Sequence, residues 1–355
     1  MPVTVKLYEQ DQGDYDTFLT QPELKPHLSF MHTWEWGEVM KSESRACLRL
    51  GIYRENKLIG LAQVQQKPLR VGGYFWYCPR GIAMDYSDHG TVTKVYRAVS
   101  RFMRKKGGAF FRVDPDIVRG DTLEKAIDKL HPAKAAIFSQ AERVWCVDIQ
   151  KTDEEQLAWM KEHGMRKNIP YYLRRSARAG VAVIASDRQN DLERLITMLQ
   201  NLRDRKNMVG GHDDHLRRQF AALGPRGYEK VFFAKKSGHA LAGALVAIYG
   251  KEASYLHGAS LDLFRELQAP HSLHFEIMRY LAKYYPEVER YNFWGIVSDK
   301  NRNPSHPRHG YSEFKRSFGG YKEEYIRARD FIYNPIAWRL DWFLQKYWAW
   351  KYKND

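Results

Sequence analysis

The chain has 355 residues, 44% of them hydrophobic, which predicts two packed domains in preference to one oversized core. Its formal net charge of +15 favours an anionic partner, such as nucleic acid, an anionic membrane surface or a phosphorylated substrate. The alternative is a basic protein that its own charge keeps dispersed. Its cysteines, Cys47, Cys78 and Cys146, form no CxxC pair, which argues against disulfides and a Cys-based zinc site and predicts buried thiols in a reducing cytoplasm.

The N-terminal segment, residues 1–16, lacks the basic-then-apolar order of a signal peptide. No apolar stretch approaches the roughly 20 residues that a bilayer span requires. We therefore expect a protein that is soluble, or at most peripheral to a membrane.

The first half of the chain predicts a hairpin, a strand, a helix and a closing strand. Two apolar runs around a polar turn indicate the hairpin at 47–65, and an aromatic run indicates the strand at 72–79. Apolar residues at helical spacing, followed by two glycines, predict a helix over 91–108. Residues 109–115 close the unit as a strand.

The second half predicts the same order of elements. Residues 230–250 form the hairpin, 252–260 a strand, 269–286 a helix and 290–296 the closing strand. The segments "LIGLAQV" and "LAGALVA" share a similar pattern of apolar and small residues, which favours a duplication.

Two helices are predicted between the halves. One begins at Thr152, which forms a capping box with Glu155, and the other covers 191–202, where leucines recur in phase. Mixed strands and helices in repeated order predict an α/β or α+β fold with helices covering sheets. We expect a first domain at 1–148 and a second at 149–332.

The C-terminal segment 333–355 is rich in aromatic residues with interleaved Arg and Lys. One interpretation is a closing helix that packs back onto the first domain. The other is an interfacial helix that rests on lipid headgroups, a depth that suits Trp and Tyr. Both can hold together.

Six segments, in order along nearly the whole chain, resemble one family, the Fem-type (FemABX) peptidoglycan aminoacyltransferases. The turn "YCPRGIAMDY" departs from the family pattern in carrying Ile82 where proline is usual. The segments are "SFMHTWEWGEVMK", "YCPRGIAMDY", "FFRVDPDI", "RRSARAGVAV", "RYNFWGI" and "GYSEFKRSFGGYKEEYI".

The resemblance implies two tandem GNAT-like acyltransferase domains. It also implies a cytoplasmic enzyme, in contact with the inner membrane face at most, that uses aminoacyl-tRNA as its co-substrate. The amino acid is joined to an amine on the stem peptide of a cell-wall precursor, either lipid II or the soluble UDP-MurNAc-pentapeptide. No other cofactor and no metal are expected, and the chain resembles the short members that lack a coiled-coil arm.

By this resemblance Lys315, beside Phe314, matches the lysine of the family's Phe-Lys motif. Attack of an amine on an aminoacyl ester passes through an oxyanion, which a fixed cation stabilises by about 3 kcal/mol. Lys315 is therefore our candidate for holding that oxyanion or the tRNA 3′ end; the alternative is an ordinary surface lysine. Asp114 is the candidate for orienting or deprotonating the acceptor amine, or else belongs to an Asp-Pro turn. Arg80 contacts a phosphate or caps a turn.

The resemblance also gives candidates for binding the acceptor. Members that hold the UDP-linked precursor use an Arg and a Tyr in a loop where this chain has Gly211 and His215, and a strand tyrosine where it has His257. These departures favour lipid II over the UDP-linked acceptor. The substrate-binding candidates are Lys41, Trp36, Arg80, His215, His257 and Tyr255.

Basic residues interleaved with tyrosines at 165–178 suit an RNA backbone and unpaired bases. The alternative is a solvated helix face. The tRNA-binding candidates are Arg166, Lys167, Arg174, Arg175 and Arg178. The polar segment 298–310 that leads to Lys315 is either a mobile lid or a plain surface connection.

Two other functions remain open at this point. One is an acyl-CoA-type N-acyltransferase on the same fold, which would need a Gly-rich turn before residue 91 or 269 to hold pyrophosphate; none is present. The other is a non-catalytic RNA- or membrane-binding protein, whose RNA affinity would fall steeply with salt.

Overall fold

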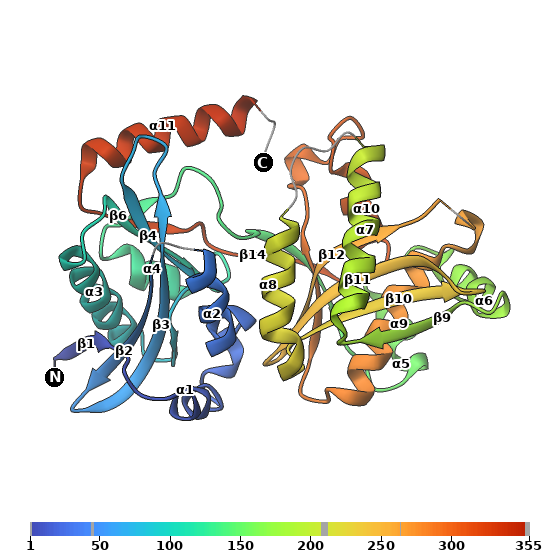
Figure 1. The fold of residues 1–355 in the computed structure, drawn as a ribbon, viewed down its shortest axis with the longest axis horizontal. Helices are drawn as coiled ribbons and strands as arrows, with labels where there is room; N and C mark the ends of the chain where they lie inside the picture. The colour runs from blue at the N-terminus through green and yellow to red at the C-terminus, as the bar shows by residue number, and fades with distance from the viewer. Residues whose placement is uncertain (1, 44–45, 207–211, 263, 352–355) are drawn as a thin grey trace. The chain divides into compact units, whose positions relative to one another are not determined.

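The computed structural model describes residues 2–43, 46–206, 212–262 and 264–351. The chain folds as two units, one of Met1–Glu142 with Glu324–Asp355 and the other of Arg143–Glu323. Figure 1 shows both units coloured along the chain and labels many of their helices and strands. Among the described helices, none is long and apolar enough to cross a membrane.

The first unit is built on one sheet with strand order β1-β2-β3-β4-β6-β15-β7, and β5 pairs with β3. Neighbouring strands run antiparallel except β4 and β6, which are parallel. The strands are β1 Val3–Leu7, β2 Cys47–Arg54, β3 Lys57–Pro68, β4 Tyr74–Arg80, β5 Ala83–Met84, β6 Phe110–Pro115, β7 Ala133–Lys134 and β15 Arg329–Ile332.

Helix α3 supplies the core of the first unit. Its buried residues recur at helical spacing and pack against the strands, as the sequence predicts: Val92, Val95, Tyr96, Val99 and Met103. The helices of this unit are α1 Gln12–Leu19, α2 Trp34–Glu43, α3 His89–Lys105, α4 Thr122–Asp128 and α11 Pro335–Lys351.

The second unit repeats this plan. Its sheet has the order β14-β8-β13-β12-β11-β10-β9, with β12 and β13 the parallel pair. The strands are β8 Arg143–Asp148, β9 Ala182–Ser186, β10 Glu229–Lys236, β11 His239–Tyr249, β12 Glu252–Ser260, β13 Arg290–Gly295 and β14 Tyr321–Glu324.

Helix α9 occupies the place that α3 has in the first unit, with Leu273, Ile277 and Leu281 in the core. Helices α7 and α8 pack against β10 and β11 and form a second cluster there, so they are part of the domain and make no projecting arm. The capping box of Thr152 and Glu155 is present at the start of α5. The helices are α5 Asp153–Glu162, α6 Ile169–Arg178, α7 Gln189–Arg205, α8 Asp213–Leu223, α9 Ala269–Tyr284 and α10 His309–Arg316.

The domain boundaries that the sequence predicted, 148 and 332, are displaced. β8 follows the first half in sequence but pairs with β13 in the second sheet. Reciprocally, β15 follows the second half but pairs with β6 in the first sheet. In each sheet this strand lies next to the parallel pair: β8 begins the second unit, and β15 returns to the first sheet after the second unit is complete. The long-range pairing moves the divisions to 142/143 and 323/324.

The C-terminal helix packs on the first unit, as expected. Ala337 and Trp338 contact a cluster of Leu69, Ala109 and Phe110. The Trp338 Nε1 donates a hydrogen bond of 2.9 Å to Asp330 Oδ2 on β15. Of the cysteines, Cys78 and Cys146 are buried, whereas Cys47 is half-buried.

Candidate active site

Lys315 lies in the last turn of α10, and its side chain is fully buried. Its Nζ donates a hydrogen bond of 2.7 Å to the carbonyl oxygen of Gly295 and lies 3.9 Å from the ring centroid of Tyr311. No carboxylate of the described residues lies within ion-pair distance of Nζ. Burial holds the pKa of Lys315 well below its usual value, and the charge of Arg308 lowers it further. The alternative of an ordinary surface lysine is therefore wrong.

The position of Lys315 follows from the sheet. β12 and β13 pair only from Glu252–Ser254 to Arg290–Asn292, and β13 then shifts register. Gly295, which accepts from Lys315, and Tyr255, whose ring centroid is 5.8 Å from Nζ, both lie just past the paired residues. The amine thus lies beside the ends of two parallel strands where their pairing stops, a common location for ligand sites.

The glycine pair after the motif fixes the end of α10. A Cβ on Gly319 would lie 2.3 Å from the carbonyl oxygen of Met160, and one on Gly320 would lie 2.2 Å from that of Cys146. Both glycines have positive φ, 78° and 111°. Only glycine permits this approach of the chain to α5 and β8, which holds Lys315 in register.

The sequence did not single out the histidine that lies beside the motif. His274, on α9, is buried; its Nδ1 is 2.8 Å from the Tyr291 hydroxyl, and its ring centroid is 5.5 Å from that of Phe314. Burial lowers the pKa of His274 well below its usual value, with Lys315 and His271 adding to the effect. The imidazole is therefore neutral at neutral pH. The sequence did not indicate this placement because His274 lies among the apolar residues of the α9 pattern.

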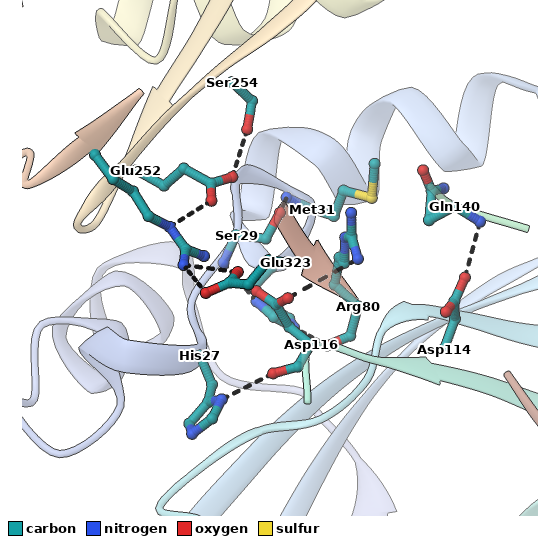
Figure 2. Close-up of polar contacts among 12 residues, drawn as sticks. His27, Ser29, Met31, Arg80, Asp114, Asp116, Gln140, Glu252, Ser254 and Glu323 are labelled. Carbon is teal, nitrogen blue, oxygen red and sulfur yellow. Dashed lines mark hydrogen bonds and ion pairs between the residues drawn. The ribbon is translucent and has the colours of Figure 1, made fainter. Parts of the chain in front are cut away.

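Asp114 lies in β6 of the first unit and is 3% exposed, so it is part of a strand and not of a turn. Its Oδ2 accepts hydrogen bonds from the Gln140 backbone N–H at 2.9 Å, drawn in Figure 2, and from the Tyr77 hydroxyl at 3.2 Å. Burial raises its pKa to about 6, although the charge of Arg80 and the hydrogen bonds oppose this shift. The carboxyl group therefore titrates close to neutral pH.

Arg80 ends β4 in the left-handed region, with φ 54°. Its guanidinium is buried and lies 3.9 Å from Asp116 Oδ1 (Figure 2). It also lies 5.1 Å from the centroid of the Tyr325 ring. Its carbonyl oxygen is 3.2 Å from His32 Nε2. These contacts give Arg80 a structural part in the turn after β4.

The other candidates of the first unit lie on α2. Trp36 is buried and packs edge-on against Phe30, with ring centroids 5.3 Å apart. Lys41 is exposed and bridges to Glu38 at 2.9 Å. Lys41 is accessible to a ligand phosphate, whereas Trp36 has its ring in the core.

The second-unit acceptor candidates lie on regular elements. Tyr255 is buried on β12, and His257 is exposed two residues further along the same strand. His215 was expected in a loop but lies in the first turn of α8, which begins at Asp213. The acidic residues Asp213 and Asp214 favour a helix N-terminus there. Gly211 lies outside the described residues.

The basic candidates cluster on and before α6. Arg166 is exposed and forms an ion pair of 3.1 Å with Glu313, Lys167 is exposed, and Arg175 is half-buried. Tyr171, Arg174 and Arg178 are exposed at i, i+3 and i+7, so they share one helix face. The segment 298–310 contains a short 3₁₀ helix at Asp299–Asn301 and turns before α10 begins.

A cavity of about 460 Å³ lies elsewhere in the second unit, beside α5 and the second half of α9. None of the candidate residues lines it. Arg279, which does, is held by Asp153 at 2.6 Å and by Glu276 at 2.9 Å. We therefore do not place the chemistry in this cavity.

Comparison with known proteins gives a consistent result. The FemAB family model matches residues 11–147 and 178–346. The lipid II:glycine glycyltransferase of Staphylococcus aureus strain MRSA252 is 20% identical over 411 residues, which cover 92% of this chain and 93% of that protein.

Solved structures share the fold. The crystal structure of FemX aligns with a TM-score of 0.80 at 18% identity, covering 94% of this chain and 99% of that one. A tandem GNAT protein from the clavulanic acid biosynthesis pathway aligns with a TM-score of 0.51 at 11% identity, covering 92% and 98%. The predictions of two GNAT-like domains and of an enzyme of the transferase class are confirmed. The chain belongs to the FemAB family.

Proposed function

We propose that this protein transfers an amino acid from aminoacyl-tRNA to the stem peptide of a peptidoglycan precursor, with lipid II as the acceptor. The family and the relatives named as lipid II:glycine glycyltransferases support this function. The observation that carries it in this chain is the fully buried Lys315, which has no carboxylate partner among the described residues. A buried amine without a counter-ion costs stability and therefore indicates a functional role.

In the proposed reaction the acceptor amine attacks the carbonyl carbon of the aminoacyl ester. The new C–N bond forms, the C–O bond to the ribose breaks, and the amine proton ends on the departing ribose hydroxyl. Negative charge develops on the carbonyl oxygen before the ester bond breaks. Lys315 would stabilise this oxygen or the tRNA 3′ end, because an adjacent negative charge raises a lysine pKa that burial has lowered.

Asp114 is proposed to orient or deprotonate the acceptor amine. A carboxyl group with a pKa of about 6 is ionised at neutral pH, yet it is basic enough to accept a proton. The hydrogen bonds from Tyr77 and Gln140 fix one carboxyl oxygen. The roles of Asp114 and Lys315 are separate proposals, each with its own test.

The tRNA is proposed to contact α6. Tyr171 is 53% exposed and shares one face of α6 with two exposed basic side chains, Arg174 and Arg178. Arginines attract the phosphate backbone and an exposed aromatic ring can stack on an unpaired base. This arrangement supports RNA contact over a purely solvated face.

An acyl-CoA donor is less well supported. In α3 the N-terminal amides of Gly90 and Thr91 are already capped by the Asp88 carboxylate, which would repel a pyrophosphate. In α9 the first turn contains Pro270, which has no N–H to offer. The α3 N-terminus thus has two of its amides occupied, and the α9 N-terminus has one amide fewer for pyrophosphate binding.

The deciding experiment supplies each charged tRNA of a full set, with the amino acid radiolabelled, together with lipid II or UDP-MurNAc-pentapeptide. We expect label in lipid II with at least one tRNA and less in the UDP-linked acceptor. Label only in the UDP-linked acceptor would replace lipid II in this proposal. No transfer to either acceptor with any tRNA would overturn it. Use of lipid II places the protein at the cytoplasmic face of the membrane.

A further inference from the structure

Helix α11 exposes a continuous apolar stripe. The five side chains that form it recur at spacings of four and three along the helix. They are Ile336, Leu340, Phe343, Tyr347 and Trp350, with exposed fractions of 75, 53, 65, 51 and 77%. At 100° per residue they fall within an arc of about 80°. Large exposed apolar side chains gathered in this way mark an interaction surface.

The opposite face of α11 is committed to the first unit. Trp338 packs beside Phe110 and donates a hydrogen bond to Asp330, which is itself held by Arg112 at 2.7 Å. Asp341, 2% exposed, accepts a hydrogen bond of 3.1 Å from the Arg70 backbone N–H. The helix is therefore fixed in orientation, and its stripe faces outward from the unit.

The charges beside the stripe have one sign. Arg339 and Lys346 lie along one edge and Lys351 along the other, and all three are exposed. Asp341 is the only acidic residue in Pro335–Lys351, and it lies on the buried side. The outward face therefore combines apolar and aromatic groups with basic groups only, which complements an anionic surface.

A second copy of this helix would be a poor partner. The spacing of four and three also fits a coiled-coil seam, but it continues for only two heptads, and a stable seam needs three or four. The edge positions hold Arg339, Lys346 and Lys351 with no acid to pair with them. Two copies would therefore bring like charges together.

We propose that α11 lies flat on a bilayer that contains anionic phospholipid, with its stripe inserted at the headgroup level. From Ile336 to Trp350 the stripe measures about 21 Å at 1.5 Å per residue, so it suits lying along a bilayer surface. Phe343, Tyr347 and Trp350 supply the aromatic groups that favour this depth, and the basic side chains reach the phosphates beside them.

The test uses the full chain with sedimenting vesicles and neither tRNA nor lipid II, so its outcome is independent of the proposed reaction. One set holds equal amounts of phosphatidylglycerol and phosphatidylcholine, the other phosphatidylcholine alone. We expect the wild-type protein to bind the mixed vesicles more tightly. Leu340→Glu with Phe343→Glu should lower the partition coefficient about tenfold or more. Arg339→Gln with Lys346→Gln should lower it for the mixed vesicles only.

Tyr284→Glu is the matched control, because Tyr284 is 55% exposed but lies on α9 of the other unit. It should bind like the wild type, and thermal unfolding should show all variants folded. Failure of the wild type to bind mixed vesicles, or undiminished binding by the Leu340/Phe343 variant, would overturn the proposal. The proposal would also be overturned if the wild type did not bind vesicles but formed a dimer in sedimentation velocity, and if the Leu340/Phe343 variant were monomeric.

Discussion

The Nζ of Lys315 lies 2.7 Å from the carbonyl oxygen of Gly295, and this hydrogen bond ties the last turn of α10 to the end of β13. An amine held by a neutral carbonyl and aromatic rings keeps much of its electrostatic capacity for a ligand. The same contact joins the Phe-Lys motif to the "RYNFWGI" strand, since the motif supplies the donor and the strand the acceptor.

Lys315→Met should lower the turnover number by about 10²- to 10³-fold, because it removes a donor that acts on developing charge. Acceptor binding should change little. The variant should stay folded, since methionine fills a similar volume and relieves the cost of a buried amine. Steady-state kinetics with lipid II and thermal unfolding check both points. A rise in the acceptor KM with unchanged turnover would contradict the catalytic role.

The raised pKa of Asp114 should produce an acid limb in the pH dependence of kcat/KM. Activity should fall as the pH drops below about 6, because protonation removes the proposed base. Asp114→Asn keeps an oxygen that can accept from Tyr77 and Gln140, and it should be slow and lack this limb. An unchanged limb in the variant would assign the titration to another group.

The raised pKa of Asp114 should also make the free energy of unfolding depend on pH, with a definite sign. Its pKa is raised from 3.8 in the unfolded chain to about 6, so the folded state binds more protons in this window. The contribution of Asp114 to stability therefore declines as the pH rises from about 4 to about 6 and is then level. Asp114→Asn should be more stable than the wild type above pH 6, and the difference should shrink on acidification, as measured by urea unfolding.

Gly319→Ala should destabilise the protein by about 2–4 kcal/mol, because a Cβ would meet the Met160 carbonyl oxygen at 2.3 Å on a backbone with φ 78°. Gly310→Ala is the control, since Gly310 lies within α10 and a Cβ there meets nothing within 4 Å. It should be stabilising by about 0.5–1 kcal/mol. Denaturant unfolding of the two variants measures the contrast. Equal effects would show that the backbone approach is not what requires glycine.

Arg178→Gln should weaken tRNA binding and reduce the slope of log affinity against log salt by about 1, as expected for the loss of one phosphate contact. Arg218→Gln, on the exposed surface of α8, should leave both quantities unchanged. Filter binding across a salt series measures them. Identical slopes for Arg178→Gln and the wild type would remove α6 from the RNA interface.

The local elements were predictable from the sequence because they rest on local patterns. Apolar spacing located α3 and α9, and Thr152 with Glu155 located the start of α5. The exchange of β8 and β15 between the sheets was not predictable, because strand pairing over such a distance leaves no local pattern. His215 was placed in a loop by the family resemblance, whereas in this chain a helix begins at Asp213.

The candidate site also has features that the sequence predicts and features that only the structure shows. The motif that contains Lys315 was visible, but its burial was not, since a lysine in a polar segment has the composition of a surface residue. His274 and Tyr291 went unnoticed because each fits an apolar pattern. Tyr77 and Gln140 belong to different segments that only the folded first unit brings to Asp114.

The most direct measurement is single-turnover transfer of a radiolabelled amino acid from charged tRNA to lipid II, with wild type, Lys315→Met and the exposed-surface control Lys161→Met compared at saturating substrates. We expect transfer by the wild type and by the control, and a rate constant about 10²-fold lower or more for Lys315→Met. Equal rate constants for all three proteins would contradict the claim that the buried amine stabilises the reaction.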